Sequence, residues 1–380
     1  MKNDIIRLVQ IEGSDKVMKR GFTLIELLAV IVILAIIALI ATPIILNIVT
    51  DSKVESIKIS AENYLDAVEQ ALARRNMTGE FKPTTCTIIS NGLSCNGYIE
   101  PLKIDIDGKT STKGTIKFDN STVSQGTAFI LDNYIVSVNE DNKLTIKPYT
   151  EPKSFATDSW QTIVENVRLG NLDKYNVGDS KKISVSKYTS SSKVRIVNTS
   201  TPSECNDKNF SQTACGFVIE FEDILTDKAI MTTTEINRGG WENCLIRNNL
   251  VSDVLYDLPD ELEEVIIDTL VVSGYSKEYN NKNFYTTDKL YLLSPKEIYG
   301  VNPEGDTLTQ TRQLDYYKKE NVSLENFSKA SKKYNGNSFE YWLRSPVQDP
   351  YGFYTVGLDG ALDSYDVYFE LGLSLAFRIG

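Results

Sequence analysis

The chain has 380 residues, a formal net charge of −11 and no histidine. At about 150 residues per domain, this length accommodates two or three domains. The acidic charge argues against nucleic acid as the main partner, because phosphate binding needs a basic face. The lack of histidine removes Ser-His and Cys-His nucleophile pairs, histidine ligands to zinc and the usual general base near neutral pH. We therefore expect a protein that is not an enzyme, with no cofactor and no metal.

An apolar stretch from Phe22 to Val49 dominates the N-terminal part, since Glu26 is the one formal charge among its 28 residues. At a rise of about 1.5 Å per residue, this stretch is long enough to cross a bilayer as a helix. Lys19 and Arg20 precede it, so this end is expected to stay on the cytoplasmic side. The residues from Asp51 onward would then lie outside the membrane.

Glu26 needs a functional explanation, because an unpaired carboxylate inside a membrane helix costs about 3 kcal/mol. The segment GFTLIELL, residues 21–28, resembles the processing site of type IV prepilins. The resemblance implies that a membrane peptidase cleaves between Gly21 and Phe22 and methylates the new amino group of Phe22. The Glu26 carboxylate of a neighbouring subunit would neutralise that amino group during assembly. The alternative is an ordinary signal anchor whose acidic residue lies in the favourable first turn of a helix.

The resemblance divides the N-terminal part into a leader peptide, residues 1–21, and a transmembrane and filament-core helix, residues 22–50. Met18-Lys19-Arg20-Gly21 alone would make a short basic leader. Either Met1 or Met18 is therefore the expected start of translation.

The helix is expected to continue beyond the membrane to about Arg75. Apolar residues recur at spacings of three or four, which is the period of one helix face. They are Val54, Ile57, Ala61, Leu65, Val68 and Leu72. Pro43 removes one backbone hydrogen bond and is expected to kink the helix. Type IV pilins commonly carry a proline at the matching place.

Residues 51–150 are expected to form the globular head of a pilin, in which a small antiparallel sheet packs on the outer half of the helix. Short alternating runs, typical of strands, replace the helical period. The runs are 99–106, 115–118, 129–131, 134–138 and 144–146. The expected fold class is therefore α+β.

The five cysteines are Cys86, Cys95, Cys205, Cys215 and Cys244. Cys86 with Cys95, and Cys205 with Cys215, are close in sequence, and each pair would close a short loop if it is oxidised outside the cytoplasm. The alternative is that both pairs stay reduced. Cys244 is expected to be a buried thiol. No CxxC spacing occurs, which argues against a zinc ribbon.

A second α+β domain is expected at residues 157–380, after a linker at residues 151–156. Its predicted elements begin with a helix that is capped near Thr157 or Asp158 and closed by Gly170. They continue with a helix that opens at 257–262 and runs through Ile267, a buried strand at 290–293 and a helix start at 294–297.

This second domain resembles a widespread bacterial surface domain of unknown function. The resemblance rests on GGWEN at 239–243, TDKLYLLS at 287–294, WLRSP at 342–346 and AFR at 376–378. The domain is also similar to C-type lectin-like folds, which mix two helices with looped sheets.

Trp342 and Arg344 are the candidate ligand-binding residues, because they combine an aromatic face with a bidentate donor. The alternative is a structural pair, with a buried indole and an arginine that holds a carboxylate or backbone carbonyls. Tyr351, Phe353 and Tyr354 could bind sugar rings.

Three aspartates near the end of the chain could hold calcium. Asp359, Asp363 and Asp366 are irregularly spaced, however, and lack the pattern of an EF-hand loop. A solvated loop is the favoured interpretation.

Together these features predict a structural subunit of a type IV pilus, as a minor or specialised pilin that displays its C-terminal domain for adhesion or interaction. The alternatives are a pseudopilin of a type II secretion or DNA-uptake machine, or a carbohydrate-binding adhesin or hydrolase activity in the last domain. The expected partners are other pilin subunits, the prepilin peptidase, the pilus assembly platform, the membrane, and host or surface glycans. The expected location is the inner or cytoplasmic membrane as a single-pass prepilin, and then the extracellular pilus.

Overall fold

A computed structural model describes residues 23–77, 82–90, 92–139, 141–234, 236–274, 283–303 and 310–380. The predicted leader and the predicted cleavage site at Gly21 and Phe22 lie outside the described residues. The chain forms two compact units, residues 1–56 and residues 57–380.

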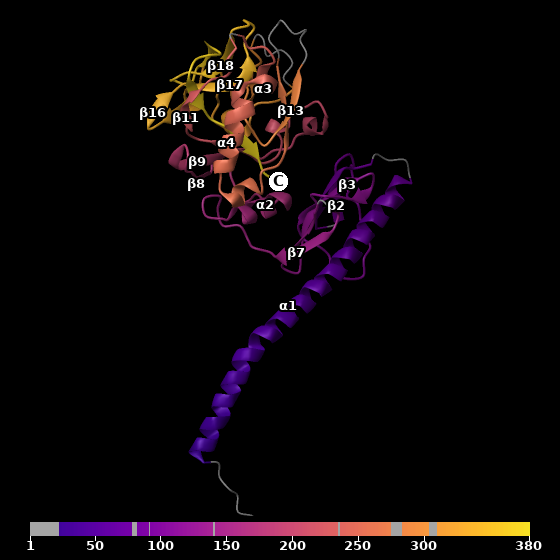
Figure 1. Cartoon of the computed structure of the whole chain (residues 1–380). Coiled ribbons are helices and arrows are strands. Elements are labelled where there is room, and N and C mark those ends of the chain that lie inside the picture. Colours follow the sequence, from indigo (N-terminus) through magenta and orange to yellow (C-terminus); the bar gives the residue numbers. More distant parts are fainter. Residues whose placement is uncertain are drawn as a thin grey trace, which may run out of the picture. The chain divides into compact units, whose positions relative to one another are not determined.

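Helix α1 runs from Leu24 to Asn76, which confirms the long helix predicted to about Arg75 (Figure 1). Pro43 lies inside this helix. Because proline has no backbone N–H, one carbonyl in the preceding turn loses its donor. In the same turn the Thr42 hydroxyl donates to the Ala38 carbonyl oxygen at 2.6 Å.

Within residues 57–380, one face of α1 is buried at spacings of three or four residues, as the apolar period predicts. The buried residues are Ile57, Ala61, Tyr64, Leu65, Val68, Ala71 and Leu72. The ring centroids of Tyr64 and Phe129 are 5.3 Å apart, so this face contacts a strand of the neighbouring sheet.

That sheet has seven antiparallel strands in the order β2-β1-β3-β5-β6-β7, with β4 paired to β3. The strands are β1 (Thr85–Ile89), β2 (Gly92–Cys95), β3 (Gly114–Asp119), β4 (Thr122–Val123), β5 (Ala128–Leu131), β6 (Tyr134–Val138) and β7 (Leu144–Pro148). Four of the five predicted runs fall on β3, β5, β6 and β7. The run 99–106 forms only an isolated bridge between Leu102 and Leu93. Pro101 lacks the N–H that a strand ladder needs, which explains this difference.

The residues after 155 share one hydrophobic core, which extends from Phe155 to Ile379. One five-stranded sheet has the order β14-β21-β10-β9-β8, and a second has the order β11-β20-β17-β18-β19. The first consists of β8 (Ser180–Val185), β9 (Thr189–Asn198), β10 (Val218–Phe221), β14 (Leu290–Tyr291) and β21 (Ala376–Arg378). The second consists of β11 (Thr226–Ala229), β17 (Tyr341–Pro346), β18 (Gly352–Val356), β19 (Leu362–Asp366) and β20 (Leu371–Leu373).

Two hairpins and several short helices complete this part of the chain. The hairpins are β12 (Thr269–Ser273) with β13 (Phe284–Asp288), and β15 (Lys332–Tyr334) with β16 (Asn337–Phe339). The α-helices are α2 (Trp160–Arg168), α3 (Gly240–Asn243), α4 (Val251–Asp257), α5 (Asp260–Glu263), α6 (Pro295–Tyr299) and α7 (Asp315–Lys319). The 3-10 helices are η1 (Ser203–Asn206), η2 (Gln212–Ala214) and η5 (Ser328–Ala330), and η3 (Ile246–Leu250) is a π-helix.

Helix boundaries differ from the sequence expectations at two places. The N-cap of α2 is Ser159, whose side chain accepts from the Thr162 N–H at 3.2 Å, rather than Thr157 or Asp158. Helix α5 ends at Glu263 instead of reaching Ile267, because Ile266 bridges Ile379 and the Ile267 N–H donates to the Arg378 carbonyl. Pairing with β21 therefore overrides the local helical pattern.

Candidate functional site

The N-terminus of α1 is a capping box made by Thr23 and Glu26. The Thr23 N–H and hydroxyl donate to Glu26 Oε2 at 2.9 Å and 2.8 Å, and the Glu26 N–H donates to Thr23 Oγ1 at 3.3 Å. This reciprocal arrangement satisfies backbone donors that a helix end leaves open. The role of Thr23 was missed at the sequence level, although the pattern of a threonine three residues before a glutamate marks it.

The helix that follows has an apolar surface exposed around its whole circumference. Every described residue from Leu24 to Ile40 is exposed in the single chain. Among the described residues, α1 is the one helix long and apolar enough to cross a membrane by length and composition. Burying one leucine or isoleucine side chain is worth about 1.5–3 kcal/mol. Such a surface is compatible with lipid or other apolar helices around it.

The two candidate ligand residues, Trp342 and Arg344, lie in β17 with no exposed surface. The Trp342 Nε1–H donates to the Ala229 carbonyl oxygen at 2.8 Å. Arg344 Nη2 donates to Glu297 Oε1 at 2.6 Å, and Nη1 pairs with Glu297 Oε2 and the Leu292 carbonyl oxygen. A ligand would need surface that neither side chain offers, so both side chains are structural in this arrangement.

Glu297 is the acceptor at the centre of this buried cluster. It also accepts from the hydroxyls of Thr213 and Thr311, and its own N–H is capped by Ser294 at the start of α6. Burial would raise the pKa of Glu297, but the Arg344 guanidinium and these hydrogen bonds hold it below its usual 4.5. The cluster therefore keeps a buried ion pair charged and joins α6 to β17.

A second buried carboxylate, Glu220 in β10, has two cationic partners. Arg195 Nε donates to it at 2.7 Å and Lys332 Nζ at 2.8 Å, and the Tyr317 hydroxyl donates at 2.9 Å. Burial would raise the pKa of Glu220, but Lys332 and Arg195 hold it below its usual value. The Arg195 guanidinium also lies 4.0 Å from the Tyr316 ring centroid. These contacts connect β9, β10, β15 and α7.

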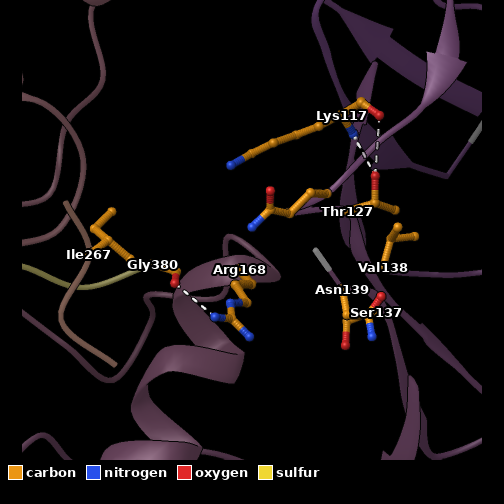
Figure 2. A pocket seen from close by; sticks show the side chains of 10 residues that line it. Lys117, Thr127, Ser137, Val138, Asn139, Arg168, Ile267 and Gly380 are labelled. Carbon is orange, nitrogen blue, oxygen red and sulfur yellow. Dashed lines mark hydrogen bonds between the residues drawn. The ribbon is translucent and has the colours of Figure 1, made fainter. Parts of the chain in front are cut away.

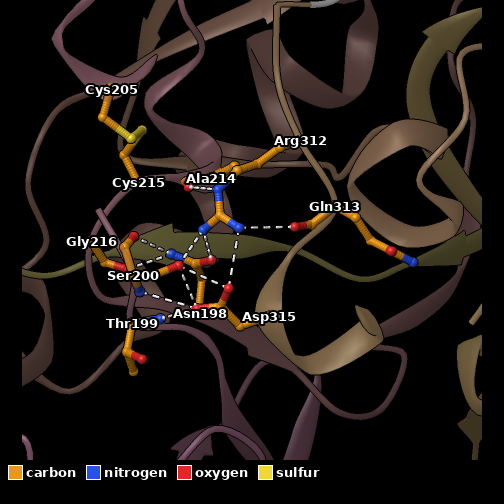
Figure 3. A network of polar contacts seen from close by, with 10 residues as sticks. All are labelled: Asn198, Thr199, Ser200, Cys205, Ala214, Cys215, Gly216, Arg312, Gln313 and Asp315. Carbon is orange, nitrogen blue, oxygen red and sulfur yellow. Dashed lines mark hydrogen bonds and ion pairs between the residues drawn. A yellow bond between two sulfur atoms is a disulfide. The ribbon is translucent and has the colours of Figure 1, made fainter. Parts of the chain in front are cut away.

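Two disulfides join the cysteines that are close in sequence, Cys86 with Cys95 and Cys205 with Cys215, and Cys244 is a buried free thiol. Figure 3 shows the second bridge beside the Arg312 guanidinium. Arg312 donates to the Ala214 carbonyl at 3.2 Å and to Asp315 Oδ1 at 3.1 Å.

The same guanidinium also donates to the side chains of Asn198 and Ser200, each at 2.5 Å. Asp315 in turn accepts from the backbone N–H groups of Thr199 and Ser200 at 3.1 Å and 3.0 Å. The loop closed by the second disulfide is therefore fixed to the start of α7.

A hollow of about 430 Å³ lies beside Lys117 and Arg168 (Figure 2). Arg168 Nη2 donates to the Gly380 carbonyl oxygen at 2.9 Å, and burial lowers the pKa of the Arg168 guanidinium. Thr127 Oγ1 accepts from the Lys117 N–H at 2.9 Å. Because Arg168 already binds the chain itself, its capacity for an anionic ligand is reduced.

The other residues predicted from sequence lie on the loops and strands around β18 and β19. Tyr351 is exposed, Tyr354 is half-buried and Phe353 is buried. Asp359 accepts from the Ala361 N–H, Asp363 from the Ser364 N–H and Asp366 from the Tyr368 hydroxyl. Among the described residues, no group of three or more cysteine, aspartate or glutamate side chains is arranged to hold a metal ion.

Two family models match the chain. The prokaryotic N-terminal methylation motif matches residues 17–42, which include Gly21, Phe22 and Glu26. A domain of unknown function, DUF6273, matches residues 219–379, from β10 to β21. No curated protein and no solved structure matches the chain. A prokaryotic N-terminal methylation motif at residues 17–42, together with a C-terminal domain of unknown function, is consistent with a type IV pilin-like protein.

Proposed function

We propose that the chain is a minor or specialised subunit of a type IV pilus, with a structural and not an enzymatic role. The observation that carries the proposal is the apolar surface of α1 from Leu24 to Val49, which is exposed in the single chain and begins with the capped carboxylate of Glu26. A helix of this kind is stable in a bilayer before assembly. It is also stable in the core of a filament, where other copies of the helix replace the lipid.

The capping box suggests how Glu26 acts during assembly. Thr23 donates both of its hydrogen bonds to Oε2, and among the described residues Oε1 accepts none. One carboxylate oxygen is thus held in place, while the other is available to the amino group that cleavage creates on Phe22 of a neighbouring subunit. Two opposite charges in contact attract strongly in a low-dielectric core, and this attraction offsets the penalty of burying each charge alone.

The C-terminal domain supports a specialised role over that of a repeating shaft subunit. It has its own core from Phe155 to Ile379, and this mass would crowd a filament made of identical copies. The subunit would display the domain outside the cell for contact with surfaces, cells or other pilins. The similarity of this domain to C-type lectin-like folds stays a prediction, as does the pilin packing of the head.

The test separates processing from assembly in cells that contain a prepilin peptidase and an assembly platform. Mass spectrometry of the N-terminus measures cleavage and methylation, and immunoblotting of sheared surface filaments measures assembly. We expect Gly21→Leu to block cleavage. We expect Glu26→Ala to be cleaved normally but to be depleted at least tenfold from the filament fraction.

Glu62→Gln is the matched control, since Glu62 is exposed on the same helix outside its apolar part, and it should behave as the parent chain. An intact N-terminus in these cells, or normal assembly of Glu26→Ala, would overturn the proposal. Normal cleavage of the parent chain without any copy in the filament fraction would instead identify a pseudopilin.

A further inference from the structure

We propose that the C-terminal domain binds a neutral sugar at an exposed aromatic cluster, defined as Tyr351, Tyr368 and Phe369. Its use in adhesion rests on the proposed display of this domain at the pilus surface. The binding itself does not depend on assembly.

The three rings of the aromatic cluster are all exposed to solvent. The exposed fractions are 51% for Tyr351, 57% for Tyr368 and 43% for Phe369. The planes of Tyr368 and Phe369 are 23° apart with centroids separated by 5.2 Å, so these two rings are stacked. Exposed rings gathered on one surface mark a binding site more often than isolated ones do.

Backbone pairing holds the aromatic cluster in place. The Val367 N–H donates to the Tyr351 carbonyl oxygen at 2.9 Å, which brings the start of β18 beside the turn that follows β19. The Val367 side chain is fully buried, and its carbonyl oxygen accepts from the Met231 N–H at 3.1 Å. Hydrogen bonds therefore fix the backbone that carries the rings, which reduces the conformational entropy lost when a ligand binds.

Polar groups lie directly beside the rings. Tyr351 and Tyr368 line a hollow of about 530 Å³ together with Asp366, Thr233 and Thr234. This volume lies in the usual range for small-molecule sites. The Tyr368 hydroxyl donates to Asp366 Oδ2 at 2.9 Å, which fixes the carboxylate next to the ring. The Thr234 hydroxyl is 2.9 Å from that of Thr232.

This combination fits a pyranose. One face of a hexose ring presents C–H groups that pack on an aromatic face, while its edge presents hydroxyls. A carboxylate accepts hydrogen bonds from such hydroxyls, and threonine hydroxyls both donate and accept. An apolar peptide would cover the Asp366 carboxylate without adding a hydrogen bond to the one from the Tyr368 hydroxyl, which is costly on desolvation.

Charge restricts the ligand to uncharged sugars. Asp366 lies in the hollow, Glu370 is exposed next to Phe369, and the whole chain carries a net charge of −11. Sulfated and sialylated glycans would be repelled. The inferred ligand is therefore a glycan that ends in a neutral hexose or N-acetylhexosamine.

The experiment uses the full-length protein in detergent micelles and biolayer interferometry on immobilised albumin conjugates. The probes are glucose, galactose, mannose and N-acetylglucosamine conjugates, with heparin as the anionic comparison. We expect at least one neutral conjugate to bind and heparin not to bind. Tyr351→Ala and Tyr368→Ala should each weaken this binding about tenfold or more, as is typical of central aromatic contacts.

Two further variants test whether a loss of affinity comes from the aromatic rings of the cluster or from removing any exposed tyrosine. Tyr368→Phe keeps the ring and should stay within about threefold of the parent affinity, since only the hydroxyl is lost. Tyr256→Ala removes an 81% exposed tyrosine from α4, outside the cluster, and should leave the affinity unchanged. Near-ultraviolet circular dichroism of each variant checks that the domain is folded.

Several results would overturn the inference. They are binding to heparin alone, binding to none of the four neutral conjugates, or equal affinity of the parent and the folded Tyr368→Ala protein. Sedimentation velocity adds a fourth: if Tyr351→Ala changes only self-association, the cluster is a contact between copies. A parent chain that assembles into filaments normally but binds no sugar contradicts this inference alone. A parent chain that binds sugar but is never cleaved contradicts the pilin proposal alone.

Discussion

Arg344 and Glu297 form a bidentate ion pair in which neither side chain is exposed to solvent. The pair explains why an arginine occurs in the WLRSP segment of β17. Its guanidinium neutralises the carboxylate of Glu297 in the first turn of α6. A buried pair of this kind adds little to stability when compared with apolar residues, but removing one partner leaves an uncompensated charge in the core.

Arg344→Met should therefore lower the free energy of unfolding by about 3–5 kcal/mol. Urea unfolding followed by tryptophan fluorescence measures this, because Trp160, Trp241 and Trp342 are all buried in the core that extends from Phe155 to Ile379. Lys143→Ala is the control: it removes an exposed pair with Asp141 and should change stability by less than about 1 kcal/mol. Equal effects of the two variants would contradict the structural role of Arg344.

The C-terminal domain should lose stability in acid. The folded-state pKa values of Glu220 and Glu297 lie below the usual 4.5, so the folded protein binds fewer protons than the unfolded chain. Their stabilisation is complete above about pH 4.5 and is lost as the pH falls through the folded-state values. The urea midpoint should therefore stay nearly constant from pH 7 to pH 5 and fall below pH 4.5. A midpoint that is flat down to pH 3 would contradict this.

The lowered pKa of Asp315 also contributes to the loss of stability in acid. Burial would raise its pKa, but hydrogen bonds from Thr199 and Ser200 and the charge of Arg312 hold the pKa below its usual 3.8. Asp315→Asn keeps an acceptor but cannot titrate, so its stability should fall less steeply below pH 4 than that of the parent protein. If the curves of stability against pH run parallel for the variant and the parent, Asp315 does not contribute to the loss of stability in acid.

The Cys244 thiol should be inert in the folded protein. Burial raises its pKa to about 12, so almost no thiolate is present at pH 8. Iodoacetamide at pH 8 should leave the folded chain unmodified and add one group in denaturant without reductant. Intact-mass spectrometry counts these groups, and reductant with denaturant should raise the number to five by releasing Cys86, Cys95, Cys205 and Cys215. Modification before unfolding would contradict the prediction.

Tyr64→Ala should loosen α1 from the seven-stranded sheet. The Tyr64 ring is buried against Phe129, and truncating a buried aromatic side chain costs about 3–5 kcal/mol. Hydrogen–deuterium exchange of β3 and β5 should become faster. Ile59→Ala is the control on the same helix, since Ile59 is 53% exposed, and it should leave the exchange rates unchanged.

Local patterns predicted the elements whose stability is local. The period of three and four residues gave α1, and the segment 294–297, with Pro295 at the first helical position, gave the start of α6, because helix faces and helix starts are short-range properties. The strands β3, β5, β6 and β7 followed from alternation. The run at 99–106 misled because one proline outweighs its alternating pattern.

Contacts between residues far apart in the sequence could not be predicted from local patterns. Glu297 and Arg344 are 47 residues apart, and nothing in the sequence around either residue identifies the other. The helix expected to open at 257–262 and to run through Ile267 was also shortened by residues near 379, since tertiary pairing outweighs a weak local preference. Likewise, residues 351, 368 and 369 come together as the aromatic cluster only because β18 pairs with β19.

The place of β21 in its sheet also sets a condition on biosynthesis. Residues 376–378 insert between β14 and β10, and without them these strands have no common neighbour. The ribosome must therefore complete residue 378 before this sheet can close. A chain threaded across the membrane as it is translated would emerge with this sheet still open, and the sheet would close on the far side.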